Sequence, residues 1–335
     1  MNTEYQNIFV SHVAGIGKTI LAIPALKALR HYFPASRITV AANPAAADIF
    51  ILSQTSVSVL PLAFNGKIPN PRTSLHTLKT LRFLKQQRFD LTLELQRNIP
   101  GGLARWLAQS GNNDHRIKLF SQIKEAVLRK TSNQKHTAQI YLELLSEIGA
   151  FAVDSEPKLQ TDRRFDAQLD LRFKQAGLNS SGLLIGIHPG GGRNITRWEQ
   201  ENFLTTAMNL TQVLDARTLI FAGPNERGMA KQMVKNLPSK KALAFESAPL
   251  IEVASALARL SVLITNQTGL AHLAAAVGTP VVALASTETS AANKLLSANH
   301  ILLKKPNINA ITIDEVQSAA LALLSANRAE VLKAR

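Results

Sequence analysis

The chain contains no cysteine, and aromatic residues make up only 5% of its 335 residues. Without cysteine, neither a disulfide framework nor a thiolate metal site can form, which fits a reducing cytoplasm. The few aromatic residues are not interleaved with basic ones in the pattern that proteins use to stack bases. We therefore expect a protein without sulfur-based redox chemistry and without a nucleic-acid partner.

Long apolar runs are missing as well. The longest mainly apolar stretch, residues 270–285, contains His272, Gly278 and Pro280. It is shorter than the roughly 20 residues that a helix needs to cross a bilayer. The first ten residues have no cationic region followed by an apolar run, so they do not read as a secretory signal. These absences predict a cytoplasmic protein.

Acidic residues are few relative to basic ones. The chain has 38 Lys and Arg against 23 Asp and Glu, a formal net charge of +15. The excess is concentrated in residues 67–130, which hold 13 Lys and Arg against 4 Asp and Glu. A field of this sign attracts polyanions, such as an anionic membrane surface or a phosphorylated, carboxylated saccharide. The alternative is a solvated face that serves solubility alone.

What is present describes an α/β protein of two domains. A chain of this length suits two domains of about 150 residues each. Apolar runs that alternate with helical patterns predict parallel sheets. The polar stretch 154–166 predicts a boundary, with domains at 1–160 and 167–320 and a helix or tail over 321–335. The runs that predict strands are residues 7–10, 37–41, 91–95, 183–187, 218–222, 262–265 and 280–284.

The segment GIGKT at residues 15–19 is similar to the end of a nucleoside-triphosphate phosphate loop. The full loop requires another glycine, separated from Gly17 by four residues, and that position is His12. No acidic pair for magnesium is obvious at the end of a partner strand, which disfavours an NTPase. We interpret the segment as a tight strand-to-helix turn. Lys18 in the first helical turn opposes the helix dipole and therefore hints at an anionic partner.

The clearest motif lies in the C-terminal half, where residues 265–276 read TNQTGLAHLAAA and residues 278–284 read GTPVVAL. These segments resemble the signature of glycosyltransferase family 9, the bacterial heptosyltransferase-type enzymes. Physically, the motif is a strand, a small polar turn and a helix whose first N–H groups can take a phosphate. In the family this turn and helix hold the donor diphosphate. The resemblance thus implies donor contacts from Gln267, Thr268, Gly269 and His272. A satisfied core histidine is the alternative for His272.

Two further segments match the family. Residues 187–192, IHPGGG, continue through TRW at 196–198 and are similar to its glycine-rich loop. Residues 221–227, FAGPNER, are similar to its Gly-x-Pro-x-Glu turn, whose Glu contacts the nucleoside. Glycines let backbone amides approach an anion, and arginines supply charge-assisted hydrogen bonds. A flexible turn with solvated arginines is the alternative. The implied donor-binding residues are Gly190, Gly191, Gly192, Arg193, Thr196, Arg197, Gly223 and Glu226.

The N-terminal half follows the family through the turn at Gly17, the segment PALKAL at 24–29 and Gln96 after Leu95. The resemblance covers about residues 7–320. It implies an α/β fold of the GT-B type, with two facing Rossmann-like domains, parallel sheets and the active site in an interdomain cleft. The C-terminal domain would bind the donor at the carboxyl ends of its strands. The N-terminal domain would bind the acceptor through Gly15, Gly17, Gln96 and Arg97.

The sequence departs from the family at three charged positions. The aspartate after the first glycine turn, the family's presumed general base, is Lys18 here. Thr196 replaces a basic residue, and Gln267 replaces an acidic one. A protonated lysine cannot accept a proton, although a lysine with a depressed pKa could, and His12 on the same strand has a suitable ordinary pKa. Lys18 and His12 are therefore the candidate catalytic residues.

The resemblance implies inverting transfer of a sugar, heptose by analogy, from a nucleotide-diphosphate donor to an anionic lipopolysaccharide-core acceptor. ADP-heptose would be a co-substrate, and we expect no tightly bound cofactor and no metal. The basic region 67–130 would steer the acceptor and hold the protein peripherally at the inner-membrane surface. Three alternatives remain: a family member with a different donor or acceptor, a nucleotide-sugar epimerase, and a noncatalytic homologue that binds saccharides or nucleotide sugars.

Overall fold

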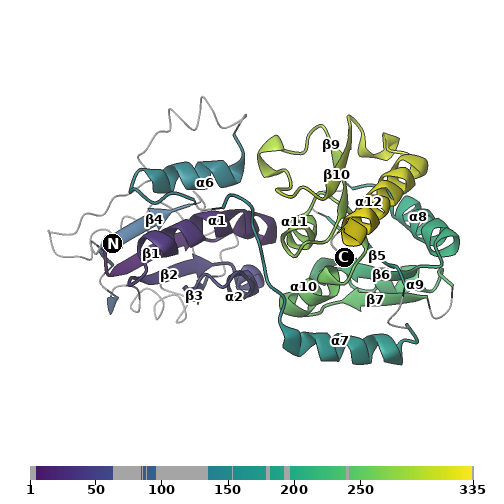
Figure 1. The fold of residues 1–335 in the computed structure, drawn as a ribbon, viewed down its shortest axis with the longest axis horizontal. Helices are drawn as coiled ribbons and strands as arrows, with labels where there is room; N and C mark the ends of the chain where they lie inside the picture. Colours follow the sequence, from purple (N-terminus) through teal and green to yellow (C-terminus); the bar gives the residue numbers. More distant parts are fainter. Residues whose placement is uncertain are drawn as a thin grey trace, which may run out of the picture. The chain divides into compact units, whose positions relative to one another are not determined.

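The protein divides into two compact units, each with a parallel β-sheet of its own (Figure 1). One unit comprises Met1–Pro157 and Ala291–Asn293, and the other comprises Lys158–Ser290 and Lys294–Arg335. The predicted α/β class with parallel sheets is confirmed. The computed structural model describes residues 5–62, 84, 86–87, 89–95, 135–152, 154–178, 182–191, 197–238 and 241–333.

The N-terminal unit contains a four-stranded sheet in the order β3-β2-β1-β4. All of its strand pairs are parallel. The strands nearest its centre are apolar and buried, because both faces of a parallel sheet are covered. The strands are β1 (Asn7–His12), β2 (Arg37–Ala42), β3 (Ser58–Pro61) and β4 (Leu91–Glu94).

Helix α1 follows β1 directly and packs against α6. It begins after Gly15, and ten of its residues are buried, so it serves as the central helix of this unit. The glycine-containing turn predicted between the first strand and a helix is therefore confirmed. The helices described in this unit are α1 (Ile16–Tyr32), η1 (Pro44–Ala46), α2 (Asp48–Ser53), α6 (Thr137–Ser146) and η5 (Ala291–Asn293).

The C-terminal unit contains a six-stranded parallel sheet in the order β10-β9-β8-β5-β6-β7. From β5 the chain builds outward through β6 and β7, and it then returns to place β8 on the other side of β5. The order of the strands thus reverses between β5 and β8. The strands are β5 (Leu184–His188), β6 (Arg217–Ala222), β7 (Ala242–Glu246), β8 (Val262–Asn266), β9 (Val281–Ser286) and β10 (His300–Lys305).

Helices of the C-terminal unit cover its sheet and bury a hydrophobic core that includes Trp198 and Phe203. Trp198 donates its indole N–H to the Ile311 carbonyl at 2.9 Å, which satisfies the polar atom of this buried side chain. No helix in the described ranges is both long enough and apolar enough to cross a membrane. The helices of this unit are α7 (Arg163–Gln175), α8 (Gln200–Val213), η4 (Pro224–Glu226), α9 (Met229–Val234), α10 (Leu250–Ala258), α11 (Gly269–Ala276), η6 (Ile308–Ala310) and α12 (Ile313–Lys333).

Candidate functional site

Three loops of the C-terminal unit meet where the strand order reverses. β5 ends at His188 and enters the glycine-rich loop, β6 ends beside Gly223 and η4, and β8 ends at Asn266 before α11. His188 and Thr265 are paired in the sheet, so the ends of β5 and β8 lie side by side. In open α/β sheets, ligands bind outside the carboxyl ends of the strands at such a switch point.

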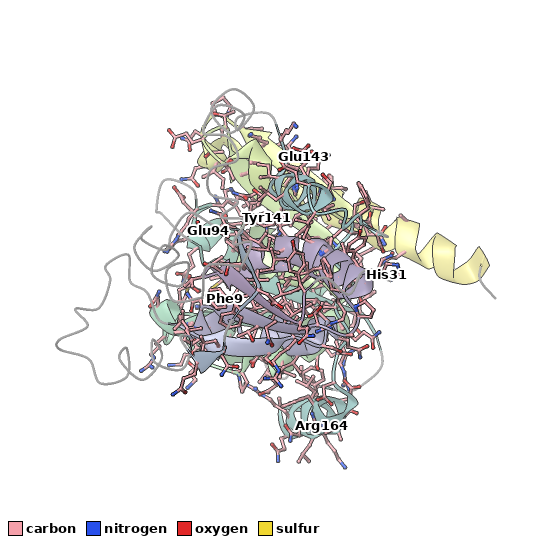
Figure 2. All side chains as sticks on the ribbon, turned by 90° about the vertical axis from the view of Figure 1, so that its left-hand side faces the viewer. Phe9, His31, Glu94, Tyr141, Glu143 and Arg164 are labelled. Carbon is pink, nitrogen blue, oxygen red and sulfur yellow. The ribbon has the colours of Figure 1, made fainter. Side chains whose placement is uncertain are left out.

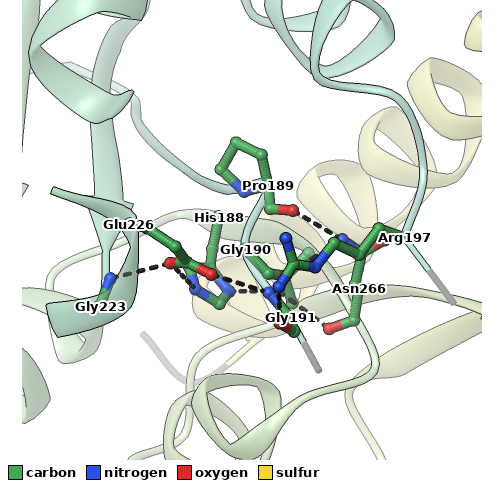
Figure 3. Close-up of polar contacts among 9 residues, drawn as sticks. His188, Pro189, Gly190, Gly191, Arg197, Gly223, Glu226 and Asn266 are labelled. Carbon is green, nitrogen blue, oxygen red and sulfur yellow. Dashed lines mark hydrogen bonds and ion pairs between the residues drawn. The ribbon is translucent and has the colours of Figure 1, made fainter. Parts of the chain in front are cut away.

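The Glu226 carboxylate lies at the centre of these loops (Figure 3). Its Oε1 accepts the N–H of Gly191 at 3.0 Å, and its Oε2 accepts the N–H of Gly223 at 2.9 Å. The imidazole of His188 is the main cause that lowers the pKa of Glu226 from 4.5 to about 2. The two glycine amides lower this pKa further, and burial opposes them. The carboxylate is therefore ionised at neutral pH.

The glycine-rich loop can approach this carboxylate only because residue 190 has no side chain. A Cβ atom at Gly190 would lie 2.2 Å from each carboxylate oxygen of Glu226, far inside van der Waals contact. At Gly191 a Cβ would meet Arg197 Cγ at 3.4 Å and Thr268 Cγ2 at 3.5 Å, which is ordinary contact. The requirement for glycine is thus steric and is strongest at position 190.

His188 contacts a polar group on each side of its ring. Nδ1 lies 3.0 Å from the Thr265 hydroxyl, and Nε2 lies 3.7 Å from Glu226 Oε2. The side chain is only 9% exposed. The sequence analysis placed the neighbouring glycines in the site but not His188. The available signal was its place as the last residue of a buried strand, directly before the glycine-rich loop.

Asn266 and Arg197 fix the backbone of the same loop. The Asn266 amide donates to the carbonyls of Pro189 at 2.8 Å and Gly190 at 3.1 Å, and its Oδ1 accepts the Trp198 N–H at 3.0 Å. Arg197 donates from its guanidinium to the Gly191 carbonyl. Asn266, which is almost fully buried, was also missed by the sequence analysis. These hydrogen bonds hold the loop in shape before any ligand arrives.

Helix α11 begins at this edge without a side-chain cap in the described part of the chain. Thr268 occupies the N-cap position, and its buried hydroxyl has no hydrogen-bond partner among the described residues. No acidic residue lies in the first turn. A helix start of this kind can bind an anion through its N–H groups and the hydroxyl.

The other predicted donor residues of this helix start have different environments. His272, on the first turns of α11, is 6% exposed. Gln267 is half-buried, and its backbone N–H donates to the Leu284 carbonyl at 2.8 Å. The structure thus brings Gly190, Gly191, Arg197, Gly223 and Glu226 together with the start of α11, in the arrangement of Figure 3.

Several predicted site residues lie outside the described residues, as does nearly all of the basic region 67–130. No group of three His, Asp or Glu side chains within the described ranges is arranged to hold a metal ion. The predicted residues outside the described ranges are Gly192, Arg193 and Thr196 for the donor and Gln96 and Arg97 for the acceptor.

The two candidate catalytic residues lie in the N-terminal unit in contrasting environments. His12 ends β1 with no exposed surface, and its ring meets Tyr141 edge-on, with centroids 5.6 Å apart. Figure 2 shows Tyr141 on α6, above the strand that carries Phe9. Lys18, in the first turn of α1, is exposed. Of the predicted acceptor residues beside it, Gly15 is exposed and Gly17 is half-buried.

Burial determines the charge state of His12. It is the main cause that lowers the pKa of His12 from 6.5 to about 4. The Lys18 ammonium lowers this pKa further, while the Lys18 backbone opposes the change. Both ring nitrogens are buried. His12 is therefore neutral at neutral pH and retains a nitrogen lone pair that can accept a proton.

Comparison with known proteins identifies relatives along nearly the whole chain. The model of the family described as glycosyltransferase family 9 (heptosyltransferase) matches residues 77–320. Among curated proteins, none matches this sequence. The chain is similar to the glycosyl transferase family 9 structure from Veillonella parvula DSM 2008, with 20% identity and a TM-score of 0.78. That comparison covers 97% of this chain and 99% of the other.

Two Escherichia coli structures are similar as well. ADP-heptose LPS heptosyltransferase II is 17% identical, with a TM-score of 0.76 and coverage of 96% of this chain and 100% of that one. Heptosyltransferase WaaC, solved with ADP, is 16% identical, with a TM-score of 0.73 and coverage of 95% and 100%. At these identities the likeness establishes the fold, so the expected α/β fold of the GT-B type with parallel sheets is confirmed.

Proposed function

This chain belongs to glycosyltransferase family 9, the heptosyltransferase family, and we propose that it transfers a sugar from a nucleoside-diphosphate donor held by its C-terminal unit. The observation that carries the proposal is the convergence of an ionised Glu226, the glycine-rich loop and the uncapped start of α11 at one switch point. A carboxylate suits ribose hydroxyls, and a helix start suits a diphosphate.

Different donor-binding residues contact the two ends of the nucleotide. Glu226 accepts hydrogen bonds from the nucleoside. Thr268, Gly269 and His272, with the amides of the glycine-rich loop and Arg197, bind the diphosphate. Support comes from the fixed geometry of the loop, which Asn266 and Arg197 hold by hydrogen bonds to backbone carbonyls. Such preorganised donors stabilise charge as it develops on a leaving group.

The reaction we propose is a direct displacement with inversion. An acceptor hydroxyl oxygen forms a bond to the anomeric carbon while the bond from that carbon to the diphosphate oxygen breaks. The hydroxyl proton passes to a base, and the electron pair of the broken bond stays on the nucleoside diphosphate. The helix start and Arg197 stabilise the charge on that diphosphate, and the site holds the two reactants in line.

For the base we propose the pair of residues predicted from the sequence. The exposed Lys18 binds a carboxylate or phosphate of the acceptor, and the neutral His12 takes the proton. On this assignment, Lys18→Ala chiefly raises the acceptor KM, and His12→Ala chiefly lowers kcat. Turnover that neither variant changes would remove both residues from the mechanism.

The full substrates follow by analogy with the named relatives. We propose ADP-heptose as the donor and an anionic lipopolysaccharide core as the acceptor, since one E. coli relative is named an ADP-heptose LPS heptosyltransferase and another was solved with ADP. The net charge of +15 supports an anionic acceptor. The enzyme would work in the cytoplasm, at the surface of the inner membrane.

A thermal-shift panel tests the donor assignment. ADP-heptose, ADP and the corresponding uridine and guanosine nucleotides are each added to the native protein, because a ligand that binds the folded state raises its Tm. ADP-heptose and ADP are expected to raise the Tm, and Glu226→Gln is expected to reduce that rise. A panel without any shift would contradict the proposed donor site, and a shift only with another base would reassign the donor.

A second candidate function is donor binding without transfer. The resemblance to the family implies charged residues at the positions that Lys18, Thr196 and Gln267 occupy here, and we propose the alternative on that ground. A noncatalytic homologue would show the thermal shift but would leave the donor intact with every acceptor. An epimerase would change the donor in the absence of acceptor.

A further inference from the structure

His188 has hydrogen-bonding partners that fix the orientation of its ring. Nδ1 lies 3.0 Å from the Thr265 hydroxyl, and which of the two donates depends on the tautomer of the ring. The same hydroxyl lies 3.0 Å from the Asn266 carbonyl. A hydrogen bond to Nδ1 in either direction sets the plane of the imidazole.

The other ring nitrogen faces an anion. Nε2 of His188 lies 3.7 Å from Glu226 Oε2, and the two side chains are only 9% and 13% exposed. An Nε2 atom without a proton would direct its lone pair at an ionised carboxylate, which is repulsive. The geometry thus favours a ring in which Nε2 carries a proton and directs it at Glu226.

Among the described residues, this pair leaves Glu226 with unused hydrogen-bonding capacity. A carboxylate offers about four lone-pair sites. One oxygen accepts a hydrogen bond from the Gly191 amide. The other accepts from the Gly223 amide and faces His188. The remaining sites can accept hydroxyl protons, and a ribose presents two adjacent hydroxyls. An ion pair that only stabilised the loop would not require a carboxylate with free lone-pair sites at the point where the strand order reverses.

We propose that His188 is a positioning residue for the nucleoside of the donor. Its Nε2–H holds the Glu226 carboxylate on the amides of Gly191 and Gly223, in the orientation in which Glu226 accepts from both ribose hydroxyls. Thr265 sets the ring orientation through its hydrogen bond to Nδ1. The inference rests on the proposed function, since it assumes a ribonucleotide donor. Arg197, a further cation among the described residues near this loop, donates to the Gly191 carbonyl and fixes the loop itself.

The first test compares ADP with 2′,3′-dideoxy-ADP by calorimetry. Both probes carry the same diphosphate, so the ratio of their dissociation constants isolates the ribose hydroxyls from any general damage to the loop. The native protein is expected to prefer ADP by about tenfold or more, because hydrogen bonds to a charged group are strong. His188→Gln and Glu226→Gln are each expected to reduce that preference to about threefold or less, with little change for the dideoxy probe.

The matched control is His300→Gln. His300 begins β10, at the opposite end of the same sheet, and its Nδ1 is hydrogen-bonded to the Ser297 carbonyl at 2.7 Å. This variant is expected to keep the native preference for ADP. A native preference in His188→Gln would overturn the proposal. Failure of the native protein to bind either nucleotide would instead overturn the proposed function.

The second test needs no ligand. Ring ¹⁵N chemical shifts at neutral pH, assigned through His188→Gln, report which nitrogen carries a proton. In the native protein Nε2 of His188 is expected in the protonated range. In Glu226→Gln, Nε2 is expected to move toward the unprotonated range, because the anion that faces it is removed. An unprotonated Nε2 in the native protein would overturn the proposal even if nucleotide binding were normal, whereas a merely structural role would not depend on the charge of Glu226.

Discussion

Glu226 can bind the two glycine amides only while residue 190 lacks a side chain. In Gly190→Ala the new methyl group would overlap both carboxylate oxygens, so Glu226 must leave its place and the ribose loses its acceptor. We expect the Kd for ADP to rise about tenfold, the effect of losing hydrogen bonds to a charged group.

The matched control for this substitution is Gly191→Ala. There the added methyl group finds ordinary contacts, and the N–H that Glu226 accepts is retained. Its Kd for ADP, measured by the same titration, is expected to change by less than about threefold. Equal effects of the two alanines would contradict the steric account of the loop.

We expect the buried His12 to make the free energy of unfolding depend on pH. Its pKa in the folded protein, about 4, is below the ordinary value of 6.5, so the unfolded chain binds a proton first as the pH falls. The contribution of His12 to the free energy of unfolding is therefore fully present above pH 6.5. This contribution is lost between pH 6.5 and pH 4, by about 3 kcal/mol in total. Urea unfolding across this range measures the effect.

His12→Leu supplies the comparison, because leucine has a similar size and does not titrate. The difference in unfolding free energy between the native protein and His12→Leu is expected to change across this pH window and to be constant above it. A constant difference throughout would mean that His12 is not buried in its neutral form.

At the scale of residues, some members of the candidate site could not be predicted from the sequence. The glycines and Glu226 could be predicted because their motif is local, with the residues close together in the sequence. His188 and Asn266 act through partners 38 to 77 positions away, which only the pairing of β5 with β8 and the turn after β6 bring together. No local pattern distinguishes such residues from ordinary strand ends.

At the level of elements, we assign the diphosphate of the donor to the start of α11. If its start binds the diphosphate, the buried Thr268 hydroxyl, which has no partner in the described ranges, becomes a ligand. Thr268→Val keeps the shape and removes the hydroxyl, so the Kd for ADP is expected to rise by about fivefold to tenfold, while the Kd for adenosine stays unchanged. Calorimetry with both ligands measures this. An equal loss for adenosine would show a general change of the site instead.

The strands of the two sheets were predicted unequally, for a physical reason. Central strands such as β8 are buried on both faces and read as continuous apolar runs. Three edge strands, β3, β7 and β10, are half-exposed, and the sequence analysis missed all three. An edge strand packs on one side only, so its sequence does not require an uninterrupted apolar run.

For the molecule as a whole, the motifs predicted the fold better than they predicted the chemistry. Solved relatives that are only 16% to 20% identical share the fold over at least 95% of this chain, because glycine turns and buried strands suffice to specify it. Likeness at these identities establishes the fold and not the charged residues on which the chemistry depends. Membership of the family therefore leaves transfer itself to be measured.

The most direct test of the central claim is a transfer assay followed by mass spectrometry. The native protein is incubated with ADP-heptose and a phosphorylated lipopolysaccharide-core oligosaccharide, with each substrate alone as a control. We expect the oligosaccharide to gain the mass of one heptose and an equal amount of ADP to appear, only when both substrates are present. An unchanged oligosaccharide beside intact, protein-bound ADP-heptose would contradict the account and would identify a binding protein in place of a transferase.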